Sequence, residues 1–361
     1  MVERELTNNK RIDFKKMLAV LIMLSVSVMS FASCGSKKSN AEGSGKIKIV
    51  CTIFPEYDWV KELIKGREEH FDLTLLMSNG ADLHNYQPTA EDILKISECD
   101  LFIYVGGESD EWVDDALKEA HNKNMVVLDL MDILGDRARE EELVEGMQGE
   151  DEDDHDHEDA DDHDHEDADE HDHEHEDGEI EYDEHVWLSL TNAQVVAEKI
   201  EEKISSLDKD EDAAKTYKNN LDEYVNKLKE LDGRYKETVA SAKNKTVVFG
   251  DRFPFRYLVD DYGINYYAAF IGCSAETEAS FKTVTFLAEK VDEYNLGTVL
   301  TIETSDQSIA KTIINNTKNK DQKILTLDSM QGVTGKEAEG GKNYLQIMED
   351  NLAVLSEALN R

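Results

Sequence analysis

The stretch KIKIVCTIFPEYDWVKELIKGREEHFDLTLLM (residues 46–77) decides the fold class. Its first segment, KIKIVCTIF, is rich in β-formers and stops at Pro55. A helical pattern follows over residues 56–65, and FDLTLLM at 71–77 has the composition of a second strand. Strands that alternate with helices predict a parallel sheet covered by helices.

This alternation continues beyond residue 77 and later begins again. The first series goes on with a helix near 91–97, a strand at 100–106, a helix near 111–122 and a strand at 125–130. A second series begins after Lys243, with strands expected at 245–250, 264–270, 297–303 and 322–328. Its helices are expected at 255–261, 280–294, 306–317 and 343–359. The sequence therefore predicts two α/β lobes, each built on a parallel sheet.

A long stretch with almost no helix breakers lies between the two series. Residues 211–242 contain no proline and one glycine. Large apolar residues recur there at helical spacing: Tyr217, Leu221, Tyr224, Leu228 and Leu231. We predict one long helix that spans both lobes and limits their closure. The expected organisation is an N-terminal lobe over 46–190, a helical connector over 191–242 and a C-terminal lobe over 243–361.

The first 34 residues have the plan of a secretory signal. A basic segment precedes an apolar run over residues 17–32, which is shorter than the roughly 20 residues of a membrane span. Phe31-Ala32-Ser33-Cys34 resembles a lipobox, with Phe31 in place of the usual leucine. We expect a signal peptide over 1–33, a lipid anchor on Cys34, a flexible tether over 34–45 and an extracytoplasmic location. An unmodified Cys34 after an ordinary signal peptide is the alternative.

The acidic charge is concentrated in one segment. The formal net charge is −41, but residues 150–184 alone hold 23 acidic residues and no Lys or Arg. DHDHEDAD occurs at 154–161 and again at 162–169, and EHDHEHED follows at 170–177. The composition predicts a disordered loop, and nucleic acid is excluded as a partner because clustered cations are missing. Seven imidazoles make this loop a candidate weak metal-binding segment: His155, His157, His163, His165, His171, His173 and His175. A solvated acidic linker is the alternative reading.

Polar residues at strand ends form the candidate site. In open α/β sheets, ligands bind outside the carboxyl ends of the strands. His84, Asp251, Glu303 and Asp328 follow predicted strands, and His185 precedes a predicted helix that Thr191 or Asn192 could start. Imidazole and carboxylate suit Zn²⁺ and Mn²⁺. Each residue alone could also be a surface histidine or a helix cap.

The cysteines add little at this stage. Cys51, Cys99 and Cys273 are spread out and do not form metal-ligand pairs. We expect buried free thiols, with a Cys51–Cys99 bridge as the alternative.

Two segments carry a family resemblance. HNYQPTAEDI (residues 84–93) is similar to the H-x-Y-x-P-T signature of the solute-binding lipoproteins that feed zinc and manganese ABC importers. DEHVWLSLTNA (183–193) resembles their second signature, D-P-H-V-W-L-x-P-x-N-A, with Glu184 and Leu190 in place of the two prolines. Other segments fall in the family's order: VGGESDEW, CSAETEAS, the strand end at Glu303, TLDSM and YLQIMEDNLAVLSEAL.

The resemblance implies a C-clamp fold in which a backbone helix joins two α/β lobes and the metal lies between them. It implies His84, His185 and Asp328 as ligands. The family's third ligand, a His or Glu after the first strand of the C-terminal lobe, falls in Gly250-Asp251-Arg252, depending on the alignment. Because arginine cannot bind a cation in its charged form, Asp251 is the expected substitute, with Glu303 in reserve.

The function implied is that of a monomeric receptor without enzymatic activity. It would capture Zn²⁺ and deliver it to the permease and ATPase of an ABC importer. The histidine-rich loop favours zinc over manganese. A manganese receptor and a surface metal-buffering adhesin are alternatives with the same site, and a zinc hydrolase is less favoured because the sequence has no HExxH motif.

Overall fold

The computed structural model describes residues 45–149, 181–274 and 278–361. The predicted signal peptide, Cys34 and the seven histidines of the acidic loop lie outside the described residues. The chain divides into Met1–Gly45 and one compact unit, Lys46–Arg361, and the account below concerns this second unit. Within the described ranges, no helix has both the length and the apolar character that crossing a bilayer requires.

The N-terminal lobe is built on a four-stranded parallel sheet of order β2-β1-β3-β4. Its strands are β1 (Ile47–Cys51), β2 (Phe71–Leu75), β3 (Leu101–Tyr104) and β4 (Val126–Asp129). Its helices are α2 (Phe54–Leu63), α3 (Ala90–Glu98), α4 (Trp112–Lys118) and α5 (Leu130–Leu134). Pro55 lies in the first turn of α2, where its missing N–H costs no hydrogen bond, so α2 begins earlier than predicted.

The C-terminal lobe repeats this plan with the sheet order β6-β5-β7-β8, again parallel. Its strands are β5 (Thr246–Phe253), β6 (Asn265–Ile271), β7 (Thr298–Ile302) and β8 (Lys323–Leu327). Its helices are α8 (Arg256–Tyr262), α9 (Phe281–Glu293), α10 (Ser308–Asn316) and α11 (Gly335–Glu339). The pairing of β5 with β6 shifts between Phe249 and Arg252. A side chain at Gly250 would lie 2.6 Å from the Cα of Ala310, so glycine lets α10 pack against β5 at this irregularity.

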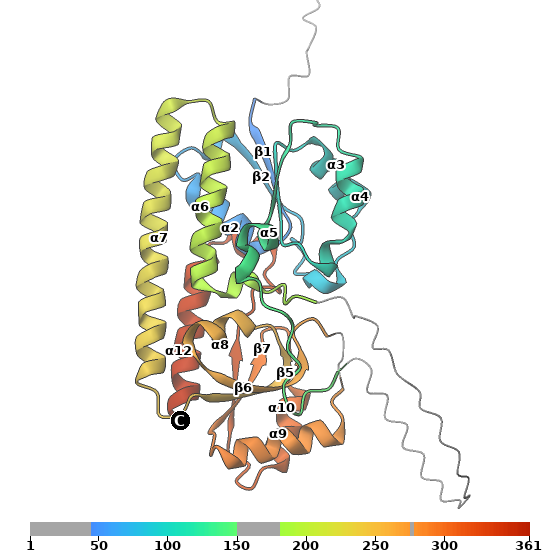
Figure 1. Ribbon diagram of the computed structural model, residues 1–361, viewed down its shortest axis with the longest axis vertical. Coiled ribbons are helices and arrows are strands. Elements are labelled where there is room, and N and C mark those ends of the chain that lie inside the picture. The colour runs from blue at the N-terminus through green and yellow to red at the C-terminus, as the bar shows by residue number, and fades with distance from the viewer. Residues whose placement is uncertain (1–44, 150–180, 275–277) are drawn as a thin grey trace, which may run out of the picture. The chain divides into compact units, whose positions relative to one another are not determined.

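Three longer helices complete the unit: α6 (Leu190–Leu207) packs on the N-terminal lobe, and α7 (Glu211–Ala240) and α12 (Tyr344–Asn360) contact elements of both lobes. Figure 1 shows α7 running beside elements of both lobes, and it contacts α2 of the first lobe and α8 of the second. The predicted long helix is therefore confirmed. Ser189, rather than Thr191 or Asn192, caps α6, because its hydroxyl accepts from the backbone N–H of Asn192 at 3.0 Å.

The main hydrophobic core is continuous from one lobe to the other. Tyr217, Tyr224 and Tyr235 of α7 are buried in the same cluster as Trp59 of α2 and Phe249 of β5. A second, smaller cluster packs α9 and α10 against the C-terminal sheet. The shared core and the side chains of α7 hold the two sheets as parts of one unit.

Candidate metal centre

His84 lies in a single 3₁₀ turn, Leu83–Asn85, after β2. The carboxylate of Asp82 caps this turn by accepting from the backbone N–H of His84 at 3.1 Å. The Nδ1 atom of His84 lies 2.8 Å from Oγ of Ser109 and 3.4 Å from Oε2 of Glu184. Burial opposes the ionisation of Glu184, but hydrogen bonds from His84 and Ser109 outweigh it and hold its pKa below the usual range.

His185 is completely buried, and contacts of Asp183, Trp187 and Gly272 fix its ring and the adjoining turn. One carboxylate oxygen of Asp183 accepts from both the backbone N–H of His185, at 2.8 Å, and its Nδ1, at 2.9 Å. The next turn is fixed to the C-terminal lobe, because the indole N–H of Trp187 donates to the carbonyl of Ser329 at 2.9 Å. A side chain at Gly272 would lie 3.0 Å from Cε1 of His185, so the backbone there closes tightly on the ring.

The two imidazoles face each other, with 3.2 Å between their Nε2 atoms. Because both Nδ1 atoms face acceptors, these partners place the ring protons on Nδ1 and leave both Nε2 lone pairs directed at each other. Two imidazole nitrogens bound to one tetrahedral zinc, at about 2.0–2.1 Å each, lie about 3.3 Å apart. The pair therefore has the spacing and the protonation that suit a shared zinc ion.

Cys273 is the third side chain of this group. It lies two residues beyond the end of β6, and one ligand atom each from His84, His185 and Cys273 lie within 4.8 Å of one another. Within the described ranges, this is the only set of three or more His, Cys, Asp or Glu residues that meets this criterion. Burial, then the nearby Glu141 and Asp183 carboxylates, raise the pKa of the Cys273 thiol.

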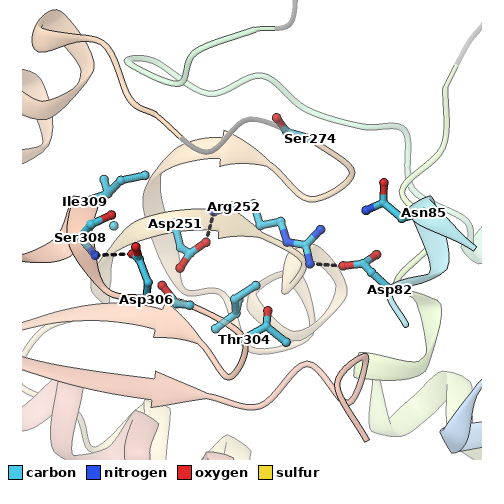
Figure 2. Close-up of a pocket in the computed structure, with 12 residues that line it drawn as sticks. Asp82, Asn85, Asp251, Arg252, Ser274, Thr304, Asp306, Ser308 and Ile309 are labelled. Carbon is cyan, nitrogen blue, oxygen red and sulfur yellow. Dashed lines mark hydrogen bonds and ion pairs between the residues drawn. The ribbon is translucent and has the colours of Figure 1, made fainter. Parts of the chain in front are cut away.

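Asp251, the expected substitute ligand, lines a cavity of about 420 Å³ (Figure 2). Its carboxylate accepts from the backbone N–H of Arg252 at 2.9 Å. Burial raises its pKa, against hydrogen bonds from Ser305 and Arg252. The guanidinium of Arg252 points away from Asp251 and forms an ion pair with Asp82 (Figure 2).

Glu303 and Asp328 shape the loop that follows β8. Glu303 accepts from the backbone N–H groups of Ser329, at 2.8 Å, and Gly332, at 3.1 Å. Asp328 pairs with Nζ of Lys342 at 3.1 Å, and burial followed by the charge of Asp328 raises the pKa of Glu303. Among the five predicted site residues, the structure brings together His84 and His185, and the three carboxylates are not part of this group.

Four side chains at the candidate metal centre were not selected as site residues from the sequence. The loop after β8 carries Gln331 to His185, with 3.3 Å between their Nε2 atoms. Asp183 and Ser109 orient the two rings, and Cys273 completes the group. Cys273 could have been found from sequence by the rule that selected the carboxylates. Like them, it follows closely after a predicted strand. Cys51 and Cys99 are free and buried, without the alternative bridge.

Two parallel α/β lobes joined by a long helix, with a histidine pair between them, define a two-lobed solute-binding protein. The family described as "Zinc-uptake complex component A periplasmic" (ZnuA) matches residues 49–358, and the chain belongs to this family. The family is one of transport components rather than enzymes, as predicted.

Relatives agree with this assignment. The chain is 30% identical over 337 residues to the zinc-binding protein AdcA of Streptococcus pyogenes, covering 93% of this chain and 60% of AdcA. It is 29% identical over 342 residues to the high-affinity zinc uptake system protein ZnuA of Bacillus subtilis, covering 94% and 97%. The chain thus spans only 60% of the length of AdcA but nearly all of the Bacillus protein.

Solved structures confirm the predicted fold class. The Zn(II)-bound ZnuA-like domain of Streptococcus pneumoniae AdcA superposes with a TM-score of 0.63 at 25% identity, covering 88% of this chain and all of the domain. The metal-dependent lipoprotein YcdH of Bacillus subtilis gives a TM-score of 0.65 at 25% identity, covering 87% and 99%.

Proposed function

We propose that this protein captures Zn²⁺ outside the cytoplasm and delivers it to the permease of an ABC importer, whose ATPase drives uptake. The single observation that carries the proposal is the histidine pair. Each ring is fixed through Nδ1, and the two Nε2 atoms lie 3.2 Å apart. Carboxylates that fix the second ring nitrogen are typical partners of zinc-bound imidazoles.

Zinc is favoured over manganese by the environment of the pair. Mn²⁺ prefers octahedral sites rich in oxygen ligands, several of which are often water. His185 is completely buried and His84 is nearly so, which leaves little room for water ligands. The relatives AdcA and ZnuA are also named for zinc.

The proposal includes the parts of the chain outside the described residues. Cys34 would attach the receptor to the membrane through its lipid, and the seven histidines of the acidic loop would bind zinc weakly and raise its local concentration. A lipoprotein name among the relatives, the zinc-binding lipoprotein AdcA of Streptococcus pneumoniae, supports the anchor.

Zinc calorimetry on the full chain in the presence of a competing chelator tests the site. Wild-type protein should retain one tightly bound zinc, and His84→Ala and His185→Ala should each lose it. His121→Ala is the matched control, because His121 is exposed on the N-terminal lobe and should leave the tight site intact. Retention of tight binding by both site variants would remove the histidine pair as the zinc site.

Growth of a deletion strain under zinc limitation distinguishes a transport receptor from an adhesin that uses the same site. Deleting the gene should impair growth when zinc is scarce, and added zinc, but not added manganese, should restore it. Normal growth of the deletion strain under zinc limitation would contradict a role in uptake.

A further inference from the structure

We infer that Cys273 is a direct ligand of the transported metal and binds it as a thiolate, so that the site has two imidazole nitrogens and one sulfur. This inference rests on the proposed function, because it names a further ligand of the same site. A thiolate is a softer ligand than imidazole or carboxylate, so it makes the ligand set as a whole softer.

The backbone after β6 brings Cys273 to the histidines. Gly272 approaches the ring of His185 so closely that any side chain there would be 3.0 Å from Cε1 and 3.0 Å from the carbonyl oxygen of Phe253. The next residue contributes its sulfur to the group whose ligand atoms lie within 4.8 Å of one another. On a tetrahedral zinc, nitrogen and sulfur ligands lie about 3.3–3.6 Å apart. The Cys273 sulfur therefore needs only a small movement toward the histidines to complete the site.

The carboxylates that could compete for this position are engaged elsewhere. Asp251 accepts from the backbone of Arg252, Asp328 pairs with Lys342, and Glu303 accepts from Ser329 and Gly332. Two neutral imidazoles alone would leave the full charge of the ion in a buried site. A thiolate offsets part of that charge, which makes a site of low dielectric tolerable for the ion.

A second observation at the same place also indicates a bound ion. Gln331 is 8% exposed, its Nε2 lies 3.3 Å from Nε2 of His185, and its Oε1 has no hydrogen-bond partner. A buried amide oxygen without a partner is costly, and so is a pair of imidazole lone pairs that face each other. A cation between the two Nε2 atoms relieves the facing lone pairs.

Binding exchanges a proton for the metal. The S–H bond of Cys273 breaks as the sulfur–zinc bond forms, and no electrons are transferred. The proton passes to water or to the carboxylate of Glu141, which the thiol contacts. Because thiolate is a soft ligand, it increases the preference for Zn²⁺ over Mn²⁺.

Cobalt spectroscopy on the full chain tests this ligand directly. Co²⁺ replaces Zn²⁺ in such sites, and a bound thiolate gives an intense near-ultraviolet sulfur-to-cobalt charge-transfer band that imidazoles and carboxylates do not give. The first equivalent of Co²⁺ should produce this band in wild-type protein and in the controls Cys34→Ala and Cys99→Ala. Cys273→Ser should lack it, although the weak sites of the acidic loop still bind Co²⁺.

The zinc and manganese affinities of the variants test the same ligand independently. Zinc affinity of Cys273→Ser should fall at least about ten-fold, the lower end of the cost of losing even an outer-shell partner. Manganese affinity should fall less, so that the zinc-to-manganese ratio decreases. Cys99→Ala should leave this ratio unchanged, because Cys99 is buried in the N-terminal lobe beside Met125.

Failure of this inference and failure of the proposed function give different results. If wild-type protein binds one zinc tightly but its cobalt complex lacks the band, Cys273 is not a ligand and the proposed function stands. A wild-type cobalt spectrum is sufficient for this result, so it does not depend on whether Cys273→Ser folds. If wild-type protein binds no tight zinc, the proposed function itself fails.

Discussion

At the scale of single residues, the site depends on side chains that do not touch the metal position. One carboxylate oxygen of Asp183 accepts from the backbone and the ring of His185. Glu184 and Ser109 contact Nδ1 of His84 in a similar way. Two of these three supporting groups, Asp183 and Glu184, directly precede His185 in the chain. The dipeptide before His185 therefore helps to orient both histidines of the centre.

The first prediction concerns Asp183. Asp183→Ala removes the acceptor that fixes the ring proton and orientation of His185, so zinc affinity should fall about 10- to 100-fold. Calorimetry against the exposed acidic control Asp114→Ala measures the change. Equal zinc affinities in the two variants would show that ring orientation does not depend on Asp183.

The second prediction concerns stability and pH. Glu56 is completely buried and caps the start of α2 through Oε2, while its Oε1 has no partner. Burial, and then the charge of Asp110, raise its pKa to about 8 from the ordinary 4.5. The folded state thus holds a proton that the unfolded state has lost, so the contribution of Glu56 to stability falls as pH rises from about 4.5 to 8.

Urea unfolding at pH 5 and pH 8 should show this loss. Wild-type protein should lose stability relative to Glu56→Gln across that interval, because glutamine stays neutral at both values. Glu119→Gln, at an exposed position of the same lobe, serves as control. A difference between wild type and Glu56→Gln that is the same at both pH values would mean that Glu56 does not titrate in this interval.

At the scale of elements, one ion pair joins the two lobes at the metal centre. Asp82 caps the turn of His84 through Oδ1, and its Oδ2 pairs with Arg252 of β5. Burial opposes ionisation of Asp82, but the charge of Arg252 and the hydrogen bond from the backbone N–H of His84 outweigh it and lower its pKa. The C-terminal lobe thus helps to orient a histidine that belongs to the N-terminal lobe.

The third prediction follows from this pair. Arg252→Ala should loosen the turn at Leu83–Asn85 and lower zinc affinity about ten-fold, less than the loss of His84 itself. Arg252→Lys should restore part of the affinity, because the charge is kept but the planar guanidinium is not. Hydrogen exchange at residues 82–85 should be faster in Arg252→Ala. Unchanged exchange together with unchanged affinity would mean that the turn does not need the pair.

Regular elements could be predicted because their signals are local. The periodic Tyr217, Tyr224 and Leu228 mark α7 without any knowledge of its neighbours, and buried strands such as β3 are continuous apolar runs in the sequence. The ligand group could not be assembled in this way. Cys273 reaches His185 only because Gly272 permits close approach, and Asp328 is drawn to Lys342, which is distant in the sequence. Such pairings depend on three-dimensional packing that no spacing rule contains.

At the scale of the whole molecule, the acidic charge is densest in one loop, and the rest of the chain keeps a formal net charge of −18. Residues 150–184 hold 23 of the acidic residues, and the segments that flank this loop are tied to the fold. Glu140 forms a bridge with Tyr182, and Gln148 forms one with Phe270 of β6. The loop is therefore attached at a defined stem beside the metal centre, which Asp183 and Glu184 directly adjoin.

The fourth prediction concerns this loop. Deleting residues 150–177 while keeping both sides of the stem should abolish several weak zinc sites and leave the tight site intact, because ordering a flexible chain around a metal costs about 1–2 kcal/mol for each residue fixed. Replacing the seven histidines with serine is the control that keeps length and acidic charge. Calorimetry counts the sites, and circular dichroism checks the fold. Loss of the tight site in a folded deletion variant would mean that the loop supplies a primary ligand.

The 30-residue helix α7 also sets how the ion can leave. Because α7 packs against both lobes, they cannot swing apart as two bodies on a loop hinge. Little of the binding free energy is then spent on moving domains, so the measured affinity approaches the intrinsic affinity of the ligands. We therefore expect dissociation to begin with the short turns around His84 and Cys273, so that the residence time of zinc depends on these two loops.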